Sequence, residues 1–109
     1  MHTLDDLHSG ALAGARHVRL THLGLTEFPR QLFHLADTLE LLDLSGNQLT
    51  SLPNDFSRFT QLRVLFASNN PFTTLPAVLG QCPQLEMVGF KACQLAHIPE
   101  NSLPARLRW

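Results

Sequence analysis

Residues 39–49 read LELLDLSGNQL, and this stretch decides the fold because its pattern returns twice. Residues 62–72 read LRVLFASNNPF, and residues 85–95 read LEMVGFKACQL. All three copies follow the spacing LxxLxLxxN/CxL, with apolar residues at the L positions. Residues 15–25, ARHVRLTHLGL, form a weaker first copy, so the pattern organises most of the chain.

A second sequence feature recurs with the same period. An apolar residue followed by proline recurs at intervals of 24, 23 and 23 residues, at Phe28-Pro29, Leu52-Pro53, Leu75-Pro76 and Ile98-Pro99. A period between about 20 and 50 residues is the signature of a solenoid built from stacked repeats. Such proteins mostly act through extended binding surfaces.

The centre of each copy alternates between core and surface residues, which is typical of a short strand with one buried face. The inward positions are Val18, Leu42, Leu65 and Val88, followed by Leu20, Leu44, Ala67 and Phe90. Strands in successive repeats lie about 4.8 Å apart and would build a parallel sheet.

The second half of each repeat has apolar residues three apart, after a proline that suits the start of a helical or 3₁₀ turn. These pairs are Leu32 and Leu35, Phe56 and Phe59, and Leu79 and Cys82. We expect the extra residue of the first interval to lie near residues 35–38, on the convex side, where loops tolerate length.

Through the LxxLxLxxN/CxL copies, the chain resembles the leucine-rich repeat family over about residues 15–109. The resemblance implies an α/β solenoid, a right-handed curved stack. Its short parallel strands would lie on the concave face and its helical or 3₁₀ turns on the convex face. It also implies a protein-interaction module that binds a partner protein or peptide through the concave sheet, without catalysis in this chain.

We expect an amino-terminal cap over residues 1–14 and about four repeats over residues 15–109. Thr3 suits a helix N-cap, and Gly10 suits the exit from a short capping helix. Arg108 and Trp109 fit the first strand of a fifth repeat that is cut off there. The open carboxy-terminal edge would then favour self-association, because an uncovered strand exposes its backbone amides.

Asn47 and Asn70 occupy the column in which the chain must turn out of its strand, and Cys93 occupies it in the fourth repeat. A side-chain amide both donates and accepts, so it can satisfy backbone groups in a buried bend. We therefore predict structural roles for this turn column. Asn47→Ala or Asn70→Ala should each cost roughly 1–3 kcal/mol of stability.

The candidate partner-binding residues are those expected to face outward on the concave sheet. They are His17, Arg19, Leu41, Asp43, Val64, Phe66, Met87, Lys91 and Trp109. One column among them is mostly apolar, and a solvated apolar stripe is unusual on a monomer. Two explanations stay open: the stripe binds a partner, with Phe66 and Trp109 as aromatic anchors, or its members and further protein cover one another.

A neighbouring column alternates in charge at every repeat, as Arg16, Glu40, Arg63, Glu86 and Arg108. Stacked strands would place these side chains in a ladder. Exposed ion pairs contribute only about 0.2–1 kcal/mol each, so we interpret the ladder as a means of fixing the register of the repeats. Arg19 and Asp43 should pair in the same way.

Composition narrows the function further. The 109 residues have a net charge of −1, which offers no field for nucleic acid or an anionic membrane. The amino terminus has acids and no apolar h-region, unlike a signal peptide. Two cysteines far from any CxxC spacing fit a reducing compartment, so we expect a cytoplasmic protein.

No catalytic or metal-binding constellation stands out. The six histidines are scattered over different columns, and no phosphate-binding glycine loop occurs, so we expect no metal and no cofactor. A Ser45, His22 and Asp43 assembly is conceivable on the concave face, but a flat sheet offers no oxyanion hole. Cys82 and Cys93 are expected to be packed thiols.

A narrower resemblance rests on four stretches, which are similar to the amino-terminal repeats of bacterial leucine-rich-repeat protein kinases. They are LAGARHVRL, FPRQLFHLADTLELLDLSGNQL, LRVLFASNNPFTTLPAVLGQCPQLEMVGFKA and LPARLRW. It implies a regulatory or recognition part of a longer cytoplasmic kinase, whose catalytic residues lie outside this chain. A third alternative is the repeat part of a secreted bacterial effector, although repeats of that class are shorter than the spacing seen here.

Overall fold

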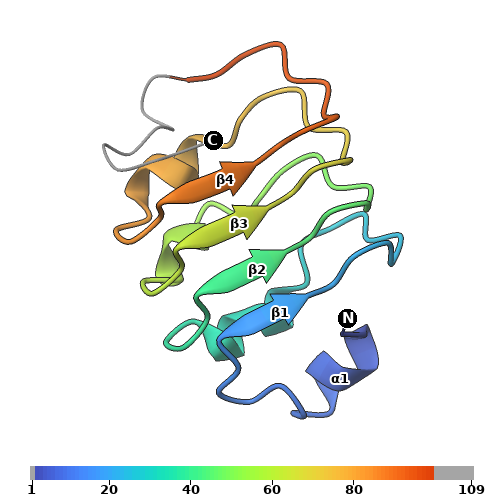
Figure 1. The fold of residues 1–109 in the computed structure, drawn as a ribbon, viewed down its shortest axis with the longest axis vertical. Helices are drawn as coiled ribbons and strands as arrows, with labels where there is room; N and C mark the ends of the chain where they lie inside the picture. Colours follow the sequence, from blue (N-terminus) through green and yellow to red (C-terminus); the bar gives the residue numbers. More distant parts are fainter. Residues whose placement is uncertain (1, 100–109) are drawn as a thin grey trace.

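The computed structural model of the chain describes residues 2–99 (Figure 1). Within these residues, one short α-helix is followed by four strands that alternate with three 3₁₀ helices. The elements are α1 Leu4–His8, β1 His17–Arg19, η1 Arg30–Leu35, β2 Leu41–Asp43, η2 Phe56–Arg58, β3 Val64–Phe66, η3 Ala77–Gln81 and β4 Met87–Gly89. The strands and 3₁₀ turns lie in the halves of the repeat to which the sequence assigns them.

The strands form one parallel sheet in the order β1-β2-β3-β4. Val18, Leu42, Leu65 and Val88 stand in register across it. Figure 1 shows the strands stacked as successive rungs, with the 3₁₀ segments on the far side of each coil. This arrangement confirms the predicted leucine-rich repeat solenoid, with the sheet on its concave face.

The inward rows merge into one continuous apolar core that runs the length of the stack. Leu20, Leu42, Leu44 and Leu65 have no solvent-exposed surface, and Val88 is 1% exposed. Burying a leucine side chain contributes about 1.5–3 kcal/mol, so these rows are the main source of stability. The prediction that the leucines face the core is therefore confirmed.

Aromatic rings fill the convex half of the core. Phe56 and Phe59 are fully buried, as their three-residue spacing predicts. Phe33 stacks on Phe59 with ring centroids 4.9 Å apart, and the half-buried Phe28 meets Phe56 edge to face at 5.7 Å. Rings from neighbouring repeats thus interlock and tie one coil to the next.

The amino-terminal helix covers the first repeat. The Thr3 hydroxyl accepts a hydrogen bond from the Asp6 amide at 3.2 Å, and Asp6 Oδ2 accepts one from the Thr3 amide at 3.0 Å. This reciprocal capping box satisfies two amides that a helix start leaves free. Leu7 is buried against the core, so α1 shields the apolar end of the stack. None of the helices within residues 2–99 is long and apolar enough to span a bilayer.

The charge ladder is only partly regular. Arg16 pairs with Glu40 at 3.7 Å, and Arg63 Nε donates to Glu86 Oε2. Within residues 2–99 no ion pair joins Glu40 to Arg63; the Arg63 amide instead donates to the Glu40 carbonyl at 2.8 Å. The expected pairing at every repeat is therefore wrong for this step, because Glu40 turns toward Arg16. The predicted last member, Arg108, lies outside the described residues.

Candidate binding surface on the concave sheet

Two rows of side chains cross the concave sheet at right angles to the strands. The register aligns His17, Leu41, Val64 and Met87 in one row, and Arg19, Asp43, Phe66 and Gly89 in the next. Lys91 lies two residues beyond β4, and its amide donates to Ser68 Oγ at 3.0 Å. The structure thus brings together eight of the nine predicted partner-binding residues; Trp109 lies outside the described residues.

The apolar row is less open than the sequence suggests. Leu41, Val64 and Met87 are half-buried, as is Phe66, because neighbours on strands about 4.8 Å apart cover part of one another. Among the described residues, Ile98 is the large apolar side chain that is clearly exposed, at 45%. Mutual covering, one of the two explanations that the sequence leaves open, therefore accounts for part of the stripe. These four side chains are only partly covered, and the rest of each side chain remains accessible to solvent.

Gly89 shapes the middle of this surface. A Cβ atom at Gly89 would lie 2.9 Å from Phe66 Cδ1, closer than such atoms approach in real proteins. The missing side chain therefore leaves room for the Phe66 ring to lie across β4. The Phe66 ring therefore forms a low aromatic ledge on the sheet, beside Met87. The sequence does not reveal this ledge, because a glycine in a strand pattern indicates only a weak strand former.

Charged side chains frame the ledge. Arg19 Nη1 lies 3.4 Å from Asp43 Oδ2, as predicted, and Asp43 Oδ1 also accepts the Ser45 amide at 3.0 Å. Arg19 and Lys91 are exposed. His17 is exposed at the start of the apolar row. The surface therefore combines half-buried apolar side chains with a basic rim.

A ladder of asparagines holds the turns at the end of the strands. Asn47 and Asn70 are each 2% exposed. Asn47 Nδ2 donates to the carbonyls of Leu20 at 2.9 Å and Leu44 at 2.7 Å, while its Oδ1 accepts the amides of Leu23 at 2.9 Å and Leu25 at 3.2 Å. These bonds join two repeats, so the side chain replaces missing backbone partners at the bend.

In the next two repeats, the residue of this turn column makes fewer hydrogen bonds than Asn47 does. Asn70 Nδ2 donates to the carbonyls of Leu44 and Ala67, both at 3.0 Å, and Asn70 Oδ1 accepts the Leu49 amide at 3.0 Å. Cys93 is half-buried, and its Sγ lies 3.4 Å from the Ala67 carbonyl. A thiol is a weak donor and accepts poorly, so the column weakens toward the fourth repeat.

The residues just before this column share an unusual backbone. His22, Asn69 and Ala92 have φ of 55°, 56° and 57°, and Gly46 has φ of 75°. The left-handed conformation suits Gly, is tolerated by Asn and His, and is costly for Ala. The strain recurs because each coil must leave its strand by the same turn. The sequence gives a signal for it in Gly46 and Asn69 only.

The convex face also carries a charged cluster that the sequence pattern does not predict. Arg30 binds Asp55 through two hydrogen bonds, at 3.3 and 2.8 Å, and Arg58 Nη1 reaches the same carboxylate at 3.4 Å. Both guanidinium groups lie over the Phe33 ring, 4.8 and 4.4 Å from its centroid. The hydrogen bond from Arg30 holds the pKa of Asp55 below its ordinary value. We interpret the cluster as a clamp between the first two convex turns.

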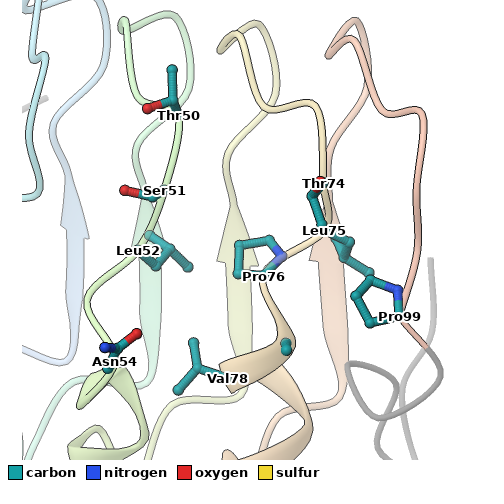
Figure 2. A pocket seen from close by; sticks show the side chains of 10 residues that line it. Thr50, Ser51, Leu52, Asn54, Thr74, Leu75, Pro76, Val78 and Pro99 are labelled. Atoms are coloured by element: carbon teal, nitrogen blue, oxygen red, sulfur yellow. The ribbon is translucent and has the colours of Figure 1, made fainter.

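A cavity of about 260 Å³ lies on the flank, where the chain descends from the strand ends to the convex turns (Figure 2). The side chains of Thr50, Ser51 and Thr74 line it beside Leu75 and Pro76. Its described lining residues, which lie within residues 50–99, are apolar, hydroxyl or amide side chains.

The structure assembles no reactive constellation from the residues considered above. No hydrogen bond joins Ser45 Oγ to His22 in the described range, and Asp43 is occupied by Arg19 and the Ser45 amide. No group of His, Cys, Asp or Glu in residues 2–99 could hold a metal ion. Cys82 is buried, and burial raises the pKa of its thiol to about 11, so it is a poor nucleophile.

A family model described as leucine rich repeat matches residues 13–72, which is more than half of the chain. The chain belongs to the leucine-rich repeat family. Among curated relatives, human PH domain leucine-rich repeat-containing protein phosphatase 1 is 29% identical over 111 residues, covering 97% of this chain. The alignment covers only 6% of that phosphatase, so the chain corresponds to a small part of its length.

Solved structures share the fold. The leucine-rich repeat domain of the type III effector XopL superposes with a TM-score of 0.74 at 27% identity, covering 88% of this chain and 32% of that one. A chain of the Toll–Spatzle complex of Drosophila superposes with a TM-score of 0.67 at 23% identity, covering 83% of this chain and 12% of that one. Leucine-rich repeat domains are typical protein-interaction modules, and this solenoid has the architecture of one.

Proposed function

We propose that this chain binds a partner protein or peptide through the concave face of β1–β4. The observation that carries the proposal is the row of Leu41, Val64 and Met87 beside the Phe66 ledge, in register on a rigid sheet. Protein interfaces usually have an apolar and aromatic centre surrounded by a polar rim. Recognition then needs shape and pattern alone, with no bond chemistry.

Two further observations support this assignment. The strands are locked by the buried asparagine ladder, so the face is organised before a partner arrives and loses little entropy on binding. The curved stack also presents side chains from four strands on one continuous surface, as repeat proteins do at their binding faces.

A random peptide library displayed on phage tests the proposal directly. Peptides enriched on the immobilised chain would be retested against Phe66→Asp/Met87→Asp, with Ala77→Asp/Gln81→Asp as the matched control. Both control positions are exposed on η3, on the convex side. We expect binding to fall at least tenfold for the concave pair and to be retained by the convex pair, with circular dichroism showing that both variants are folded. Equal binding by the concave pair would refute the proposal.

The similarity to the repeat domain of the type III effector XopL favours a second candidate context, the repeat part of a secreted effector. A translocation reporter fused to the gene product in a bacterium with a type III system tests it. Transfer of the reporter into host cells supports this context, and retention in the bacterium contradicts it.

The regulatory part of a bacterial protein kinase is the other context that the sequence resemblance implies. Its support is the similarity of the repeats alone. The sequence of the full reading frame tests this context. A glycine-rich loop followed by HRD-like and DFG-like motifs would establish a kinase, and the absence of these motifs would exclude the kinase context.

A further inference from the structure

The concave face carries free positive charge and no free negative charge among its described residues. Asp43 is the carboxylate of this face, and both of its oxygens are engaged, by Arg19 and by the Ser45 amide. The ammonium group of Lys91 is exposed and makes no hydrogen bond or ion pair within residues 2–99. Arg19 remains 48% exposed beside Asp43.

Carboxylates at the strand entrance do not offset this charge. Glu40 is paired with Arg16, and Glu86 is paired with Arg63. The hydrogen bond to Glu86 raises the pKa of Arg63 above its ordinary value, which shows that this arginine is already engaged. The ladder is therefore close to neutral, and the field over the sheet comes from the basic rim.

The basic and apolar groups have a defined spacing. Met87, Gly89 and Lys91 follow one another at every second residue, so Met87 and Lys91 are about 13 Å apart along an extended chain. Ser68 Oγ accepts the Lys91 amide at 3.0 Å, which fixes the backbone from which the ammonium group projects. The Phe66 ledge lies across β4 between these two residues. An apolar centre therefore borders a free ammonium group on one continuous strip.

We propose that the segment this face binds is acidic as well as apolar. Its aliphatic or aromatic side chains would cover Met87, Val64 and Phe66, while a carboxylate about four extended residues away would meet Lys91. The inference rests on the proposed function of the concave face and adds the charge of its partner.

The peptide selection described above also tests this inference. We expect the enriched peptides to combine apolar residues with Asp or Glu, and replacement of the critical acid by its amide to weaken binding about two- to fivefold. Lys91→Glu should weaken the parent peptide by a similar factor and have little further effect on the amide peptide. Gln81→Glu, which also introduces a carboxylate but places it on the convex side, is the control for an added acid. The effect should shrink in 0.5 M salt, because salt screens exposed charges.

The outcomes separate the two proposals. Neutral or basic peptides that still lose binding in Phe66→Asp/Met87→Asp would overturn the acidic partner and leave the concave site standing. Peptides that are insensitive to that double variant would overturn the concave site itself. Acidic peptides that bind the Lys91→Glu variant as tightly as they bind the parent would also overturn the inference, because the peptide carboxylate would then not contact Lys91.

Discussion

Replacing Asn47 by alanine should destabilise the solenoid more than the same change at Asn70. Alanine at 47 removes the bonds to the amides of Leu23 and Leu25 and to the carbonyl of Leu20. Each buried backbone group left unpaired costs about 1–3 kcal/mol. Because the first turn can admit some water near half-buried Leu23, we expect a total loss of about 3–5 kcal/mol. This exceeds the roughly 1–3 kcal/mol expected from the sequence, since the structure shows three buried backbone groups that depend on Asn47.

The change at Asn70 has a smaller expected cost for a structural reason. The Leu49 amide loses its bond, but the carbonyl of Leu44 keeps Asn47 Nδ2 and the carbonyl of Ala67 keeps the Cys93 thiol. One unpaired amide costs about 1–3 kcal/mol. A domain of this size has a total stability of about 5–15 kcal/mol, so both effects are measurable.

Urea unfolding followed by far-ultraviolet circular dichroism measures the difference. The free energies of unfolding are compared at equal m values, because a changed m would signal a different unfolded or native state. Gln48→Ala is the control, since Gln48 is exposed next to Asn47 and should change stability by less than about 0.5 kcal/mol. Equal losses at 47 and 70, or losses no larger than that of the control, would refute the reasoning.

Four further predictions concern other parts of the molecule. Leu65→Ala removes a fully buried core side chain and should cost about 2–5 kcal/mol; a urea midpoint equal to that of the parent would contradict the core assignment. Gly89→Ala should be destabilising in the parent and neutral or stabilising in a Phe66→Ala background, because the clash with the ring is then gone; additive effects in the four-member cycle would disprove the ledge. Burial raises the pKa of Cys82 from 9.0 to about 11, so the unfolded state loses its proton first. Stability should therefore fall by about 2 kcal/mol as the pH rises from 9 to 11, a decline that Cys82→Ala should abolish. The half-buried Cys93 should react with a thiol reagent at pH 8 well before Cys82 does, and equal rates would contradict the burial.

The buried rows of the parallel sheet can be predicted from the sequence because the same pattern recurs in each repeat. A single alternation such as that around Leu42 is ambiguous, but its return at Leu65 and Val88 after 23 residues each fixes the strand, the parallel direction and the register together. The prolines and the three-residue spacing of Phe56 and Phe59 likewise place the 3₁₀ turns. Repetition supplies the information that one short segment lacks.

Contacts that break the period could not be predicted in this way. The His2 amide donates to the Arg19 carbonyl at 2.8 Å, and the Arg19 amide donates to His2 Nδ1 at 3.1 Å, so His2, which precedes the N-cap residue of α1, pairs with the edge of β1. Nothing in the repeat pattern marks His2 for this role. The clamp formed by Arg30, Asp55 and Arg58 is also unique to two turns, and its partners occupy different repeat positions.

The concave face shows both cases. Its membership follows from the alternation, so the rows that contain Leu41, Val64 and Met87 are predictable. The depth of each side chain depends on its neighbours, and the Phe66 ledge exists because Gly89 lacks a Cβ atom. Sequence patterns tell which residues share a face, whereas accessibility and ring orientation require the packing.

The most direct test of the binding surface is a methyl NMR titration of the chain with a peptide from the library selection. Methyl signals of Leu41, Val64 and Met87 should shift with the added peptide, while those of Leu32 and Leu79, buried under the convex turns, should stay in place. Shifts confined to methyl groups on the convex side would contradict the assignment of the concave sheet as the binding face.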